Sequence, residues 1–357
     1  MMTQIDVPNS PGFFISKWRE KGPVEIEVLE QWKEEMNIES WLMIAEAAMF
    51  LDAAELLELV ENQLSPAEKA TLGLVRRRML GDNHLEQAIN DAIKIAKAPE
   101  TRDLKLEGRL RMERGLSRFE SGDIEGADDD LTWSEIRLKS VAKASRDHDL
   151  SLLNKAAFHM ATGAPLMALA VYSDISRNSG HANETIAISR LGASRIRASL
   201  GHMFDAARHA WNAHAHAIKA KQINMAIEAG TLFIELSLEN TSPDAELMKD
   251  QVIKAKPRSG DESEPILNVN TKDIEDVFLW CHSMLPESHS GEQRPDLRAM
   301  VSIAAKINKL ELFSDLLENP DDVEDSMLVA IVQACISDGG LKSKWNQRLT
   351  VLTLDNL

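Results

Sequence analysis

The strongest constraint on the fold is a pattern of two helical runs joined by a tight turn, which recurs along the chain. The turns fall at five residues that lie 41, 41, 38 and 39 positions apart: Gly81, Gly122, Gly163, Gly201 and Asn240. Five residues after each of the last four turns the sequence has an alanine: Ala127, Ala168, Ala206 and Ala245. A small side chain there allows the second helix of a pair to cross close to the first. The spacing therefore predicts a series of stacked helix hairpins.

The composition also favours an all-α fold. Aromatic residues make up only 5% of the 357 residues, with a single Tyr, and alternating runs of β-branched residues are almost absent. Such runs are the material from which sheets are built. A chain of this length exceeds the usual size of a single core, so we expect one long repetitive body or two domains.

The repeating unit resembles the tetratricopeptide repeat family. The family's small, glycine, alanine and bulky positions are matched in three successive units by Gly115, Gly122, Ala127 and Leu131, by Ala156, Gly163, Ala168 and Tyr172, and by Ser194, Gly201, Ala206 and Ala210. The resemblance implies a right-handed α-α superhelix of stacked hairpins with helical terminal caps. The units here are longer than the family's, and they lack its early aromatic and its closing proline. A looser α-solenoid of the armadillo or HEAT kind is the alternative.

We expect four segments along the chain. Residues 1–64 are predicted to form an N-terminal arm and capping helices, 65–255 the repeats, 256–271 a linker, and 272–357 a C-terminal helical cap. The linker is rich in Pro, Gly, Ser and charge. Terminal caps are expected because a stacked helical core must be covered at both ends.

Local signals refine the boundaries. Residues 1–22 contain several prolines and glycines and are predicted to be an irregular arm that docks on the body through its apolar side chains. Pro23 suits the first turn of a helix that runs to about Met36, and Ser65-Pro66 suits the start of the next. The pair Gly339-Gly340 is expected to break the last helix.

The charge and the cysteine content limit the partners and the compartment. The chain has 57 acidic against 40 basic residues, a net charge of −17, so phosphate backbones and anionic lipids should repel it. We therefore expect neither a nucleic-acid nor a membrane partner, and the pattern implies no particular oligomeric state. Two cysteines, no secretory signal and no long apolar run favour a cytoplasmic protein.

The sequence contains no recognisable catalytic motif. It has no phosphate-binding glycine loop, no dinucleotide fingerprint, no nucleophile elbow and no paired-histidine zinc motif. His202, His209 and His216 lie seven residues apart, too far along a helix for one metal ion to bridge. We expect them on a solvated or partly packed face. The chain is thus predicted to be no enzyme and to need no cofactor or metal.

The resemblance places a set of first-helix side chains on a concave face. These residues are largely apolar: Arg109, Met112, Leu116, Phe119, Leu150, Leu153, Met160 and Leu191. An apolar groove of this kind is costly to leave in water, so a partner segment or the chain's own terminal arm should cover it. The predicted function is that of a protein–protein interaction scaffold, with a protein or peptide as partner.

One repeat position carries a column of cationic or titratable residues. Its members are Arg77, Arg118, His159 and Arg197. One interpretation is internal ion pairing, with Asp128, Asp129, Asp130 and Asp205 as partners. The alternative is a regulatory module that senses an anionic ligand or acidic peptide through this column, because arginine forks hold carboxylates with two hydrogen bonds.

Overall fold

The computed structural model describes residues 10–82, 85–239, 271–288 and 293–354, and every regular element in these ranges is helical. The prediction of an all-α fold is confirmed, and helices that follow one another in the sequence pack on each other. Two compact units form, Met1–Phe158 and His159–Leu357, and each is described by itself. The predicted linker up to residue 270 and the turn at Asn240 with Ala245 lie outside the described residues.

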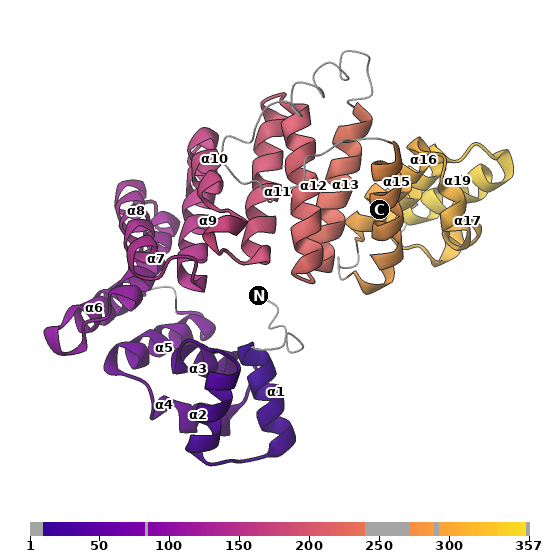
Figure 1. Ribbon diagram of the computed structural model, residues 1–357. Helices are drawn as coiled ribbons and strands as arrows, with labels where there is room; N and C mark the ends of the chain where they lie inside the picture. Colours follow the sequence, from indigo (N-terminus) through magenta and orange to yellow (C-terminus); the bar gives the residue numbers. More distant parts are fainter. Residues whose placement is uncertain (1–9, 83–84, 240–270, 289–292, 355–357) are drawn as a thin grey trace. The chain divides into compact units, whose positions relative to one another are not determined.

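Unit 1 is an assembly of short and medium helices (Figure 1). In chain order these are α1 (Pro11–Lys21), α2 (Ile26–Glu35), α3 (Trp41–Phe50), α4 (Ala54–Glu61), α5 (Pro66–Met79), α6 (Glu86–Lys97), the 3-10 turn η1 (Pro99–Thr101), α7 (Leu104–Glu120) and α8 (Ile124–Val141). The boundary between the units falls inside α9 (Arg146–Ala161). One continuous apolar core extends from Phe14 in α1 to Leu110 in α7.

Helix α1 corrects the expected irregular arm. Ser10 accepts a hydrogen bond from the backbone N–H of Phe13 at 3.1 Å, and Pro11 occupies the first helical position. A serine cap followed by proline is a helix start, and this signal outweighs the nearby glycines. The expected docking through apolar side chains is confirmed, because Phe14 and Trp18 are buried. Gly22 then ends α1 with a positive φ of 79°.

Of the two other predicted helix starts, one is confirmed and one is displaced. Helix α5 begins as expected at Ser65-Pro66, where Ser65 and Glu68 cap each other's backbone N–H groups at 3.2 and 2.9 Å. The helix expected at Pro23 begins three residues later, at Ile26, since Pro23 lies in the turn after α1.

The hairpin of α7 and α8 contains the predicted close crossing. A side-chain carbon added at Gly115 would lie 3.0 Å from Cγ of Leu131 and 3.2 Å from the carbonyl oxygen of Ala127. Farther along the same contact, Ser134 Oγ donates to the carbonyl oxygen of Gly108 at 2.7 Å. The two backbones thus approach closely over about two turns, and the positions where they approach are occupied by the small residues Gly108 and Gly115.

Unit 2 contains the remaining helices. They are α10 (Pro165–Asp174), η2 (Arg177–Ser179), α11 (Asn183–Ser199), α12 (Met203–Lys219), α13 (Ile223–Glu239), α15 (Thr271–Met284), η3 (Leu285–Glu287), α16 (Pro295–Lys306), η4 (Leu310–Phe313), α17 (Ser314–Glu318), η5 (Pro320–Asp322), α18 (Ser326–Cys335) and α19 (Gly339–Leu354). Helices α11, α12, α13 and α15 lie side by side (Figure 1). Among the described helices, none is both long and apolar enough to cross a bilayer.

The hairpin of α11 and α12 repeats the contact seen in unit 1. Ser194 Oγ donates to the carbonyl oxygen of Ala206 at 2.7 Å, as Ser134 does to Gly108. Ala206 is fully buried, as are Ala127 and Ala168. The small residues of the sequence pattern therefore lie where helices of one unit touch.

The C-terminal helices differ from expectation at one point. Gly339-Gly340 begins α19 rather than breaking a helix, because Asp338 caps the new helix by accepting from the N–H of Leu341 at 2.8 Å. The indole of Trp345 is fully buried, and its Nε1 donates to the carbonyl oxygen of Leu317 at 2.9 Å. This hydrogen bond anchors α19 to the rest of unit 2.

Candidate functional site

A cavity of about 460 Å³ lies within unit 1. It is enclosed by α3, by one face of α5 along most of its length, by the start of α6, by the first three turns of α7 and by the first half of α9. Its floor is made of buried apolar side chains: Leu42, Leu74, Leu85, Ile89, Leu106, Leu110 and Met112. A cavity of this size is typical of ligand sites, which commonly measure about 300 to 1,000 Å³.

An ion pair lies in the cavity wall. Glu46 on α3 and Arg109 on α7 form a salt bridge, and their side chains are only 11% and 17% exposed. Burial alone would lower the pKa of Arg109, but the carboxylates of Glu46, Asp147 and Glu113 outweigh it and raise the pKa. The guanidinium is therefore charged at any physiological pH, and it holds α3 and α7 together across the cavity.

Other charged residues line the same cavity. Lys105 bonds to Glu39 and lies 3.9 Å from Asp147, so it links the start of α7 to the loop before α3 and to the start of α9. These links add charged contacts to the apolar core that α3 and α7 share. Because Lys105 is about one-third exposed, each contact contributes little to stability.

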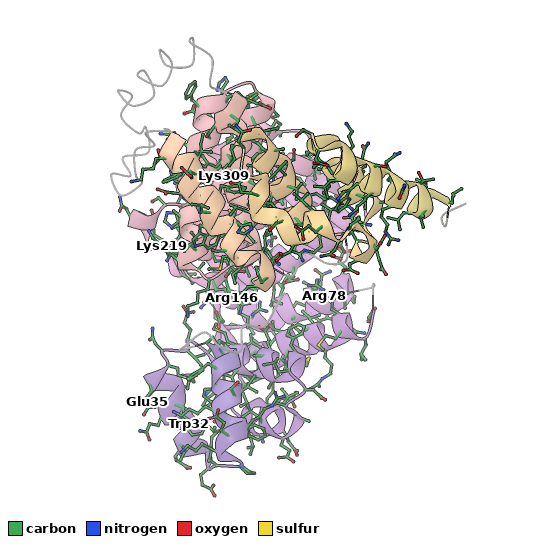
Figure 2. All side chains as sticks on the ribbon, turned by 90° about the vertical axis from the view of Figure 1, so that its right-hand side faces the viewer. Trp32, Glu35, Arg78, Arg146, Lys219 and Lys309 are labelled. Atoms are coloured by element: carbon green, nitrogen blue, oxygen red, sulfur yellow. The ribbon has the colours of Figure 1, made fainter. Side chains whose placement is uncertain are left out.

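Arginines lie at the more open part of the cavity. Arg78 pairs with Glu113 at 2.7 Å, while Arg146 is exposed and forms no ion pair with any described residue. Figure 2 shows Arg78 and Arg146 at a similar height in the view, with Trp32 and Glu35 below them. Arg146 is thus a charged group at the cavity with donors left for a ligand.

Exposed apolar side chains also border the cavity. Phe50 at the end of α3 is 54% exposed, and Met79 at the end of α5 is 49% exposed. Each belongs to a residue type that is usually buried, and both occur at the edge of one hollow. The opening is therefore apolar at one part and cationic at another.

No known family accounts for this arrangement. Protein-family models, curated proteins and solved structures were all compared with the chain, and none matches it. The function of the cavity therefore has to be inferred from its own residues.

The eight residues predicted for a concave face do not all lie on one surface. Arg109, Met112 and Leu150 line the cavity together. Leu116 and Phe119 instead pack near Phe158, with the two phenyl rings edge to face and their centroids 5.4 Å apart.

The other three predicted groove residues lie elsewhere. Leu153 is half-buried on α9, and it does not line the cavity. In unit 2, Met160 is exposed, whereas Leu191 is buried beside Ala213 and Ala229. The predicted face is thus brought together in part, around α7.

The predicted arginine column is largely engaged in ion pairs in unit 1. Arg77 bonds to Asp82 at 3.2 Å, and Arg118 bonds to Asp130 at 3.0 Å and to Glu86 at 3.2 Å. The pairing of Arg118 with Asp130 is one of those that the sequence suggested. In these two members the arrangement agrees with internal ion pairing rather than with a vacant anion site.

The column members in unit 2 are placed differently. His159 is buried, and Arg197 donates toward the ring Nδ1 of His202 at 3.3 Å. Asp205, one of the carboxylates expected to pair with the column, lies 3.4 Å from Arg208, which is not a column member. Of the three histidines spaced seven apart, His202 is exposed, His209 is half-buried and His216 is buried, so they lie on a partly packed face, which is one of the two arrangements expected.

The charged residues of the cavity that sequence reasoning did not identify include Glu46, Lys105, Arg146 and Asp147. Glu46 carries the one signal that could have revealed it. It is the single charge in the apolar helix WLMIAEAAMF, and a charge in such a helix requires a partner. The other three come from two separate elements, and only the tertiary structure brings them to one hollow.

Proposed function

We propose that this chain is a non-enzymatic binding protein of stacked helix hairpins, related in architecture to tetratricopeptide repeats, whose unit 1 cavity receives a peptide segment of a protein partner. The observation that carries the proposal is the composition of the cavity. An apolar floor accepts one or two apolar side chains, and charged residues at the opening accept the polar backbone and flanking charges.

Two features favour binding over catalysis. The described residues that line the cavity include no histidine and no cysteine, which are the usual proton-transfer and nucleophilic groups near neutral pH. Several of the lining charges are held in ion pairs, which fixes their positions. Such a lining suits recognition of a partner's shape and charge.

A peptide suits the opening better than a small polar metabolite. Phe50 and Met79 extend the apolar surface beyond the hollow itself, so a ligand longer than the cavity can continue its contact outside. Exposed apolar side chains at the edge of a concave site are typical of protein-binding surfaces.

The proposal is tested by selecting displayed random peptides on the full chain and measuring their affinity for two tryptophan variants. Val75 lines the cavity from α5, and Val75→Trp should fill part of the hollow. Lys69→Trp adds the same side chain to an exposed position of the same helix, away from the cavity. We expect Val75→Trp to weaken binding about tenfold or more and Lys69→Trp to leave it unchanged. Peptides that bind both variants equally well would refute the proposal.

A second function is favoured by one observation. Arg146 lines the cavity without an ion pair to any described residue, so it is available to an acidic group of the ligand. In that case the site selects acidic peptides, and Arg146→Gln should weaken their binding more than it weakens the binding of neutral peptides. Equal losses of affinity for acidic and neutral peptides would contradict selection of acidic peptides and would favour recognition through the apolar floor.

A further inference from the structure

Three polar side chains gather between α11 and α12 in unit 2. Arg197 lies in the last turn of α11, and Arg208 and His209 lie in the first half of α12. The hydrogen bond from Ser194 to the backbone of Ala206 fixes the register of the two antiparallel helices. That register brings the end of α11 beside the start of α12, where these residues are.

Each of the three side chains has a buried nitrogen without a hydrogen-bond partner among the described residues. These atoms are Nε of Arg197, Nε of Arg208 and Nδ1 of His209. Buried donors are normally satisfied, and an isolated exception is costly to the fold. Arg208 and His209 are consecutive in α12, and the charges of Arg208 and Arg197 both act on the imidazole of His209, so the three exceptions lie in one neighbourhood. This indicates that a ligand or an ion completes the arrangement.

The local charge is positive although the protein as a whole is acidic. Within the described residues, Arg208 has one carboxylate partner, Asp205 at 3.4 Å, and Arg197 has none. Burial lowers the pKa of His209 to about 3, and the charges of Arg208, Arg190 and Arg197 act in the same direction. The imidazole is therefore neutral at physiological pH, with one ring N–H to donate.

The ordinary explanations do not satisfy these groups. The guanidinium of Arg197 is directed to a second base, Nδ1 of His202 at 3.3 Å, rather than to an acid. Two guanidinium charges beside a neutral imidazole are stabilised when a negative charge lies among them. Arginine nitrogens and an imidazole N–H are also the donors that commonly hold oxyanions in proteins.

We infer that Arg197, Arg208 and His209 form a binding site for a small phosphate-type oxyanion. The anion accepts hydrogen bonds from the buried Nε–H groups of the two arginines and from the imidazole ring. Its charge offsets the mutual repulsion of the cluster and links α11 to α12. This site lies in unit 2 and is independent of the peptide-binding cavity, so either one can fail without the other.

The inference is tested by calorimetric titration of inorganic phosphate into the full chain at neutral pH and constant ionic strength. We expect saturable binding that weakens about tenfold or more in Arg197→Met and in Arg208→Met. Arg195→Met is the matched control, because Arg195 lies on the same helix but is exposed and paired with Glu228. Its phosphate affinity should equal that of the unsubstituted protein. Acetate, with a single charge and a planar group, should bind more weakly than phosphate.

A second readout follows the imidazole directly. When phosphate binds, nuclear magnetic resonance should show the pKa of His209 rising from about 3, since a negative charge favours the protonated ring. Absence of saturable phosphate binding would overturn the inference. So would equal affinity in the three methionine variants, or acetate binding as tightly as phosphate. If a methionine variant does not fold, Arg197→Lys and Arg208→Lys decide, because they keep the charge but lose the Nε donor.

Discussion

At the scale of single residues, Asp130 is shared by three arginines of unit 1. Its buried carboxylate bonds to Arg114 at 2.6 Å and to Arg118 at 3.0 Å, and it lies 3.6 Å from Arg111. The hydrogen bond that Arg114 donates to Asp130 is the main cause that raises the pKa of Arg114. The three arginines come from α7 and the carboxylate from α8, so this cluster fastens the hairpin beside the crossing at Gly115.

Asp130→Asn should destabilise the protein strongly. The substitution keeps the shape of the side chain but leaves the three arginines without their shared negative charge. Breaking a buried ion pair from one side typically costs about 3 to 5 kcal/mol. Urea unfolding measures the loss. The control is Asp129→Asn, whose side chain is exposed on the same helix and should change stability by about 0.5 kcal/mol or less. Similar losses in the two variants would contradict the role given to Asp130.

His209 predicts how stability depends on pH. Its pKa is about 3 in the folded protein against 6.5 ordinarily, so between these values the unfolded chain takes up a proton that the folded chain does not. The free energy of unfolding should therefore fall as the pH falls through this window, by about 1.4 kcal/mol per pH unit. His214, whose pKa is lowered chiefly by burial, contributes in the same direction.

The pH prediction is measured by urea unfolding in phosphate-free buffers between about pH 6 and pH 4. In His209→Gln one titrating group is removed, so the slope should be shallower than in the unsubstituted protein by about the single-proton amount. An unchanged slope would mean that His209 is protonated in the folded state, contrary to its buried position beside three arginines.

At the scale of elements, the helix crossings depend on glycine where no other residue fits. An alanine at Gly115 would press against Leu131 and the backbone oxygen of Ala127, whereas nothing lies within 4 Å of the same position at Gly73 in α5. Both glycines are inside helices, where alanine is favoured by up to about 1 kcal/mol. The packing, and not the helix propensity, distinguishes them.

Gly115→Ala and Gly73→Ala should therefore change stability in opposite directions. We expect Gly73→Ala to raise the free energy of unfolding by about 0.5 to 1 kcal/mol. Gly115→Ala should lower it by about 1 kcal/mol or more, because the added carbon forces α7 and α8 apart. Denaturation midpoints of the two variants decide the comparison. A stabilised Gly115→Ala would show that α7 and α8 can separate there at little cost.

Much of the arrangement of helices and hairpins could be predicted from the sequence. The turn glycines and the alanines after them have a local cause, so their spacing alone predicts the hairpins. The errors also have local causes. At α1 and α19 the pattern of prolines and glycines predicts an interruption of helical structure, but Ser10 and Asp338 cap new helices there. A cap beside a breaker marks a helix start, and the cap was the more informative residue.

At the scale of the whole molecule, the cavity could not be predicted from the sequence. Its wall is drawn from α3, α5, α7 and α9, and the ion pair of Glu46 with Arg109 joins residues that are 63 positions apart. No periodicity links such positions. The resemblance to a repeat family led to Arg109, Met112 and Leu150, but the lining residues between Glu39 and Phe50 that complete the hollow lie outside the predicted repeats.

The division into two units has a consequence for ligand binding. The peptide cavity is formed wholly within Met1–Phe158, and the oxyanion cluster wholly within His159–Leu357. A peptide and phosphate should therefore bind without competing. Titration of phosphate into the chain saturated with a selected peptide should give the same affinity as titration into the chain alone. Strong competition would mean that the two ligands share a site.

Hydrogen–deuterium exchange of the full chain with and without a selected peptide is the most direct test of the cavity as the binding site. We predict slower amide exchange in α3, α5, α7 and the first half of α9, with α11, α12 and α13 unchanged, and loss of this protection in Val75→Trp. Protection confined to residues beyond His159, or protection that persists in Val75→Trp, would contradict a binding site in the cavity.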